Sequence, residues 1–112
     1  MNSEKSSDMW EKVGADKELV KKSLLLAERD IKTAKNVFED KDYDWSLAIA
    51  YNAMLQAGRS LMFSEGFRPK GQYKHVAVIE FVKSRFKEFA DQMLFVFNKT
   101  RKNFITWKTL YT

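Results

Sequence analysis

The stretch Gly66-Phe67-Arg68-Pro69-Lys70-Gly71 decides how this 112-residue chain folds. It contains the only proline and two of the four glycines. Proline fixes its own φ and disfavours the α region for the residue before it, so a helix cannot continue through this point. The chain must therefore turn here, and the stretch, which we call the junction, separates two helix-patterned blocks.

Two long helices are predicted before the junction. The first covers about residues 15–39, where apolar residues recur every three or four positions, as on one face of a helix. These residues are Leu24, Ala27, Ile31, Ala34 and Phe38. An acidic turn at 40–44 follows, where Asp42 or Asp44 can cap a second helix over 43–65. Its apolar stripe is Leu47, Ala50, Tyr51, Met54, Ala57 and Leu61, and Gly66 is a natural terminator.

Two more helices are predicted after the junction. A short third helix covers 73–84, and a weak break at Ser84-Arg85 separates it from a fourth that runs from about residue 86 to 106 or beyond. The apolar face of the fourth helix includes Phe89, Met93, Val96, Phe97, Phe104 and Trp107. Short links between four helices predict an all-α fold, an antiparallel up-and-down four-helix bundle whose third helix is short. Residues 1–14 are expected as a flexible leader and residues 15–112 as a single domain.

Composition excludes several classes of protein. The chain is 45% hydrophobic and 14% aromatic, which argues against intrinsic disorder, and it has no cysteine for disulfides, thiolate metal sites or nucleophiles. Its first ten residues lack the apolar core of a signal peptide, and no apolar run is long enough for a membrane span. We therefore expect a cytoplasmic protein without a membrane association. A bundle this small is not expected to bury all its aromatic residues alone, which favours a homodimer.

Charge is divided unevenly along the chain. Residues 1–67 hold ten Lys/Arg and twelve Asp/Glu, a net charge of −2, whereas residues 68–112 hold ten and three, a net charge of +7. A basic half suggests an anionic partner such as RNA, a nucleotide phosphate or an acidic protein surface. Solvated helix faces that only keep the protein in solution would give the same asymmetry.

Most enzyme signatures are absent from the sequence, which has no Gly-rich phosphate loop, no nucleophile elbow and no paired zinc-binding histidines. The only histidine, His75, has apolar neighbours that favour packing or a loop hydrogen bond over catalysis. Asp40, Asp42 and Asp44 could attract a divalent cation, but the glycine and glutamate of a Ca²⁺ loop do not follow. We expect these aspartates to act as helix caps, with no metal and no cofactor. Aromatic residues near the second helix could stack on bases, although core packing is favoured.

A basic cluster on the fourth predicted helix is the strongest candidate site. Lys99, Lys102 and Asn103 can share one helix face, with Arg101 beside it. Lys and Arg there could bind phosphate, and Asn could bind an oxygen or a base edge. The alternative is a basic C-terminal turn that complements the helix dipole. Arg68 and Lys70 of the junction are accessory candidates for contact with an anion.

The chain resembles the HEPN family, named for nucleotide binding in higher eukaryotes and prokaryotes, from about Leu25 to Lys108. The resemblance is carried by Ala27-Glu28-Arg29-Asp30, by residues 43–54 from Tyr43 to Met54, by the junction and by His75. It implies a small antiparallel helical bundle that pairs as a homodimer through the last helices. It also implies a minimal nucleotidyltransferase as partner, since many prokaryotic members are RNase toxins with such an antitoxin.

The RNase members of this family carry an Arg, usually a polar residue after it, and a His four to six residues on. Two such motifs meet across the dimer and cut RNA without metal. In this chain Arg101 or Lys102 fills the arginine position and Asn103 the polar one, but the histidine position falls near Thr106 or Trp107. Neither is a base near neutral pH, and Tyr111, the nearest ionisable substitute, has an ordinary pKa of about 10.

Three functional hypotheses follow from these residues. The first is a catalytically degenerate HEPN-like dimer that binds a nucleotide, an RNA phosphate or a partner nucleotidyltransferase as part of a toxin–antitoxin-type pair. In this hypothesis the protein is not an enzyme. The second is a metal-independent endoribonuclease with a degenerate motif, and the third is a purely structural assembly subunit.

Overall fold

The computed structural model describes residues 9–89, 91–92 and 95 of the chain. Their elements follow in the order β1 (Trp10–Lys12), α2 (Lys17–Glu39), α3 (Tyr43–Ser64), β2 (Phe67–Pro69) and α4 (Lys74–Arg85). Residues 87–89, 91–92 and 95 are also helical. The described part of the chain is thus mostly helical, as the sequence predicts.

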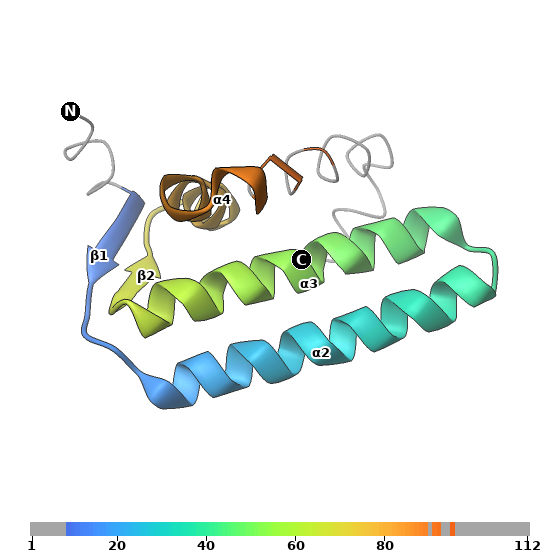
Figure 1. The fold of residues 1–112 in the computed structure, drawn as a ribbon, viewed down its shortest axis with the longest axis horizontal. Helices are drawn as coiled ribbons and strands as arrows, with labels where there is room; N and C mark the ends of the chain where they lie inside the picture. Colours follow the sequence, from blue (N-terminus) through green and yellow to red (C-terminus); the bar gives the residue numbers. More distant parts are fainter. Residues whose placement is uncertain (1–8, 90, 93–94, 96–112) are drawn as a thin grey trace.

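The two long helices form an antiparallel hairpin, in which they lie side by side (Figure 1). Asp16 caps α2, since its carboxylate accepts hydrogen bonds from the backbone N–H groups of Glu18 and Leu19. The turn after α2 uses Lys41 in the left-handed region, with φ 67°. Its N–H donates to the carbonyl of Phe38, which closes the end of the helix.

The face by which α2 contacts α3 is built from small and polar residues. The buried positions of α2 are Ser23, Ala27, Asp30 and Ala34. They are spaced by three or four residues, so they lie on one side of the helix. Only Ala27 and Ala34 belong to the apolar stripe predicted from the sequence, because the helix is rotated so that Leu24, Ile31 and Phe38 are exposed.

The junction forms a strand rather than an unstructured turn. Its strand β2 pairs antiparallel with β1, with Trp10 opposite Pro69 and Lys12 opposite Phe67. The carbonyl of Gly66 accepts hydrogen bonds from the N–H groups of Val13 and Gly14, and the φ of Gly66 is +88°. The flexible leader expected over residues 1–14 is therefore wrong for residues 10–12, which the junction holds in a two-stranded sheet.

The core lies where α3, α4 and the small sheet meet. Its fully buried large side chains include Tyr51, Leu55, Met62, Val78, Phe81 and Val82. Phe81 is at the centre: Trp10 of β1 meets it edge-on with ring centroids 5.1 Å apart, and Phe67 of β2 lies 5.7 Å away. The guanidinium of Arg85 lies 4.3 Å above the same ring and also pairs with Glu65 at 2.8 Å. The junction is thus anchored by aromatic packing as well as by backbone hydrogen bonds.

Helix α4 ends at Arg85, because Phe86 has an extended backbone with φ −137°. This agrees with the weak break predicted at Ser84-Arg85. In Figure 1 α4 is seen nearly along its axis, whereas α2 and α3 lie across the picture, so α4 crosses α3. The up-and-down arrangement of four helices stays a prediction, since most of the fourth predicted helix lies outside the described residues.

Close approach of α3 and α4 depends on Gly58. A Cβ atom at this position would lie 2.7 Å from Cγ1 of Val78 and 3.1 Å from Cγ2 of Val82, and both valines are fully buried. Glycine in a helix interior costs up to about 1 kcal/mol relative to alanine. The chain therefore accepts a poor helix former here because the contact between the helices leaves no room for a side chain.

We expect Gly58→Ala to lower the free energy of unfolding by about 1 kcal/mol, because overpacking outweighs the gain in helix propensity. Val78→Ala should also destabilise, by about 2 kcal/mol, through a cavity. The double variant should lose clearly less stability than the sum of the two losses, because the methyl group added at position 58 fills part of the cavity left at position 78. Urea unfolding followed by circular dichroism measures all three, and strict additivity would contradict the close contact.

Candidate functional site

The residues with the strongest sequence-based case lie outside the described part of the chain. They are Lys99, Arg101, Lys102, Asn103 and Tyr111. Among the described residues, three places bring polar or charged side chains together. These are the junction, a buried network between α2 and α3, and a pair of groups where α3 faces α4.

The structure gives both accessory candidates of the junction a partner from the N-terminal strand. Arg68 is exposed on β2, and its Nε donates to Oε2 of Glu11 at 2.6 Å. The backbone N–H of Lys70 donates to the carbonyl of Met9 at 2.9 Å, and the residue is half-buried. An anion would therefore have to compete with Glu11 for the Arg68 guanidinium. The main role of these residues in the described structure is to hold β1 against β2.

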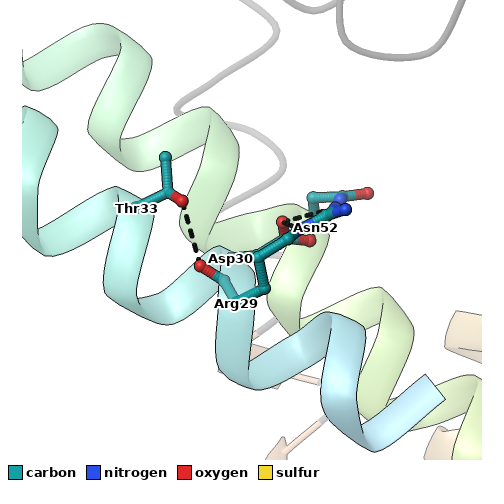
Figure 2. A network of polar contacts seen from close by, with 4 residues as sticks. All are labelled: Arg29, Asp30, Thr33 and Asn52. Atoms are coloured by element: carbon teal, nitrogen blue, oxygen red, sulfur yellow. Dashed lines mark hydrogen bonds and ion pairs between the residues drawn. The ribbon is translucent and has the colours of Figure 1, made fainter. Parts of the chain in front are cut away.

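A buried carboxylate connects the two long helices. Asp30 is 5% exposed, and one of its oxygens accepts from Nε and Nη2 of Arg29 at 3.1 and 2.8 Å. Its other oxygen accepts from Nδ2 of Asn52 on α3 at 2.6 Å. Figure 2 shows Asp30 and Asn52 reaching toward each other from facing helices. Three donors thus satisfy a charge that would be costly to bury alone.

The sequence alone does not reveal this network, although both residues lie in the segments that carry the family resemblance. The sequence signal that could have indicated this network is the helical spacing of Asp30 relative to small residues. Asp30 falls on the same helix side as Ser23, Ala27 and Ala34, all of them small, and such a side is suited to close contact with another helix. The network fixes how α2 and α3 are aligned, and it also holds the exposed guanidinium of Arg29 at the surface.

His75 is half-buried near the start of α4, where Arg59 of α3 acts on it electrostatically. Burial lowers the pKa of His75 below its ordinary 6.5, and the Arg59 charge lowers it further. Burial likewise raises the pKa of Tyr51, which the same Arg59 charge partly offsets. His75 is therefore neutral at physiological pH. This environment favours the structural role expected for it.

The acidic turn does not form a cation site in the described structure. Asp42 is the N-cap residue of α3, but its side chain makes no capping hydrogen bond. No group of three His, Cys, Asp or Glu side chains that could hold a metal ion occurs among residues 9–89, 91–92 and 95. In the same part of the chain, no helix is both long and apolar enough for a bilayer crossing.

The aromatic residues near α3 divide between core and surface. Tyr51 is fully buried and Phe67 packs on Phe81, whereas Tyr43 and Tyr73 are 55% and 69% exposed. Tyr43 contacts Phe38 of α2, with ring centroids 5.1 Å apart. The expected core packing thus holds for some of these side chains and not for others. Tyr43 thus leaves apolar surface at the turn between α2 and α3, and Tyr73 does so at the start of α4.

Comparison with known proteins adds one finding. A family model described as HEPN domain matches residues 20–111, which is most of the chain and confirms the resemblance drawn from the sequence. Comparison with curated proteins found no match, and neither did comparison with solved structures. The match includes the Asp30–Asn52 network, the junction and the basic cluster at residues 99–103.

We expect Asn52→Ala to lower the free energy of unfolding by about 2 kcal/mol, because it leaves a buried carboxylate oxygen without its interhelical donor. Thr33→Ala is the matched control. The Thr33 hydroxyl donates only to the Arg29 carbonyl of its own helix at 3.0 Å, so its loss should cost less than about 0.5 kcal/mol. Equal effects of the two changes would show that Asn52 does not hold the helices together.

The lowered pKa of His75 predicts how stability depends on pH. The unfolded chain binds the proton at its ordinary pKa of 6.5, before the folded chain does. Stability is therefore complete above pH 6.5 and falls as the pH drops toward the lower folded pKa. Thermal unfolding between pH 7.5 and 5 should show this loss, and His75→Gln should reduce it. A His75→Gln variant with an unchanged pH profile would contradict the assignment.

Proposed function

The chain belongs to the HEPN domain family, and from this premise we propose that it is a helical homodimer that binds a nucleotide or RNA phosphate. The observation that carries the proposal is the family match over residues 20–111. The chemistry of the chain agrees with it, because residues 68–112 have a net charge of +7. Basic side chains in such excess supply the sequence-independent attraction that nucleic-acid backbones require.

Within the basic half, we propose residues 99–103 as the binding site, and the pairing of the described arginines supports this choice. Arg68 pairs with Glu11, and Arg85 pairs with Glu65 while its guanidinium lies over Phe81. Both arginines thus have acidic partners from the first half of the chain, which lowers their attraction for an external anion. We therefore place phosphate binding at Lys99, Arg101, Lys102 and Asn103, with Tyr111 as an accessory candidate.

The proposed protein is a binding module rather than an enzyme. Its sequence keeps a basic residue and Asn103 where RNase members of the family have their arginine and polar residue, but it has no histidine in the matching position. Without that base the 2′-hydroxyl of RNA cannot be activated in the way the family's motif implies. We propose that the chain forms one component of a toxin–antitoxin-type pair, with a minimal nucleotidyltransferase as its partner.

The test is to replace both Arg101 and Lys102 with Ala. Affinity for RNA and for nucleoside triphosphates should fall by about tenfold or more, and the salt dependence of RNA binding should become shallower, because fewer phosphates are neutralised. Lys21→Ala with Lys22→Ala is the matched control, since it also removes two adjacent basic residues, in this case from exposed positions of α2. Its affinity should change little.

Three outcomes would overturn parts of this proposal. Equal affinity of wild type and both double variants would remove residues 101 and 102 from the site. RNA cleavage by the purified protein that persists in EDTA and disappears in the Arg101/Lys102 variant would replace the binding module with a metal-independent RNase. No measurable binding of RNA, nucleotide or a co-expressed nucleotidyltransferase would favour a structural subunit.

A further inference from the structure

An open groove between α2 and α3 is lined mainly by apolar side chains, five of them alanines, and has a volume of about 560 Å³. Its lining extends from Ala27 to Phe38 on α2 and from Ser46 to Ala57 on α3, which is eleven positions on each helix. At 1.5 Å per residue the groove is about 16 Å long. Because alanine side chains are short, the groove has room for large apolar side chains from another segment.

The chain itself enters this groove at Phe89. This side chain is half-buried, lines the groove together with Met54, and packs against the core cluster that includes Tyr51 and Leu55. The other described helical residues that follow Phe86 are all exposed, namely Lys87, Glu88, Asp91, Gln92 and Phe95. The helical stretch after α4 therefore turns one face toward the groove, and Phe89 marks that face.

The sequence after Phe89 continues the same face. Large apolar residues follow it at helical spacing, namely Met93, Val96, Phe97, Phe104 and Trp107. Phe95, which is 62% exposed, falls on the opposite side of such a helix, as this spacing requires. In Figure 1 the short described pieces after α4, in orange, lie nearer than α4 to the turn between α2 and α3. The chain therefore runs along the groove in the direction opposite to α3.

We propose that residues 93–107 of the same chain occupy this groove, antiparallel to α3, and that the acidic turn at 40–44 restrains the basic cluster at 99–103. The length of the segment supports this placement. Phe89 lies at the level of Met54, and two antiparallel helices advance equally per residue. Eleven residues beyond Phe89 is position 100, and eleven before Met54 is position 43. The basic cluster thus reaches the level of the acidic turn.

The charges of the two segments are complementary. The turn carries three exposed carboxylates, Asp40, Asp42 and Asp44, against one lysine, and the carboxylate of Asp42 makes no capping hydrogen bond. The basic cluster brings two lysines and an arginine. A phosphate that binds the cluster must therefore compete with the carboxylates of the turn. This contact regulates the binding site of the proposed function, and its effect on RNA affinity rests on that function.

The absence of cysteine from the chain makes a direct test of the placement simple. Ala50 lines the groove and lies four residues before Met54, so it should face Met93, which lies four residues after Phe89. Ala50→Cys with Met93→Cys should form a disulfide within one chain under mild oxidation. Ala50→Cys with Phe95→Cys is the matched control. Phe95 is 62% exposed, so this pair should stay unlinked.

Thermal unfolding provides a second measurement of the placement. Phe97→Ala should lower Tm by about 10 °C or more, because it empties part of the groove, whereas Phe95→Ala should change Tm by less than about 2 °C. Phe97→Leu serves if Phe97→Ala does not fold, and its Tm should still fall more than that of Phe95→Leu.

The charge contact is tested at the turn. Asp42→Asn with Asp44→Asn should raise affinity for RNA about threefold at low salt. Glu18→Gln with Glu28→Gln is the matched control, because it changes the net charge equally at exposed positions of α2 far from the turn. Without RNA, the Asp42/Asp44 variant should lower Tm by about 3 °C, and this loss should vanish when Arg101 and Lys102 are already alanine.

Three results would overturn the inference. If the Ala50/Met93 pair links no better than its control and Phe97→Ala costs no more than Phe95→Ala, these residues do not occupy the groove. Linkage between two chains instead of within one would assign the groove to the segment of another molecule. An Asp42/Asp44 loss of Tm that persists without Arg101 and Lys102 would remove the charge contact. A wild-type chain that binds no RNA would overturn the proposed function, whereas cross-linking and Tm still decide the placement.

Discussion

The hydrogen bond from Asn52 to the buried carboxylate of Asp30 is the constraint on which the arrangement of the two long helices depends. A carboxylate that is 5% exposed must keep its donors, and Asn52 supplies one of them from the facing helix. This arrangement sets the small residues of the two helices against each other. In the same arrangement Leu24, Ile31 and Phe38 are exposed on α2.

The other end of the molecule is held by a different kind of interaction. The ring of Phe81 on α4 packs against Trp10 of β1 and Phe67 of β2. This one ring therefore connects the N-terminal strand, the junction and α4. Gly66 allows the backbone to turn at φ +88° between α3 and β2. Because Arg68 and Arg85 both pair with acidic residues there, this end serves to join elements and not to gather positive charge.

Local signals in the sequence predict the helices well, but they do not predict the pairing of strands that lie far apart in the chain. The predicted ranges 15–39, 43–65 and 73–84 match α2, α3 and α4 to within two residues, because caps, Gly66 and helical spacing act locally. Strand β1 was missed, since three residues whose strand partner lies 55 or more positions away carry no periodic signal. The orientation of α2 was also misjudged. Counting apolar residues favoured Leu24 and Ile31 over Ser23 and Asp30, whereas close helix contact favours small side chains and a satisfied charge.

The candidate site divides in the same way. Residue type and charge indicate a basic cluster at 99–103, and the family match extends over it. The hydrogen bond between Asp30 and Asn52, in contrast, joins residues far apart in the chain and cannot be predicted from composition. Positive charges concentrated in one half of a chain repel one another, which destabilises that half unless acidic groups lie nearby. Glu11 and Glu65 from the acidic half do this for Arg68 and Arg85. Two acidic residues of the first half thus offset the charges of two arginines of the basic half.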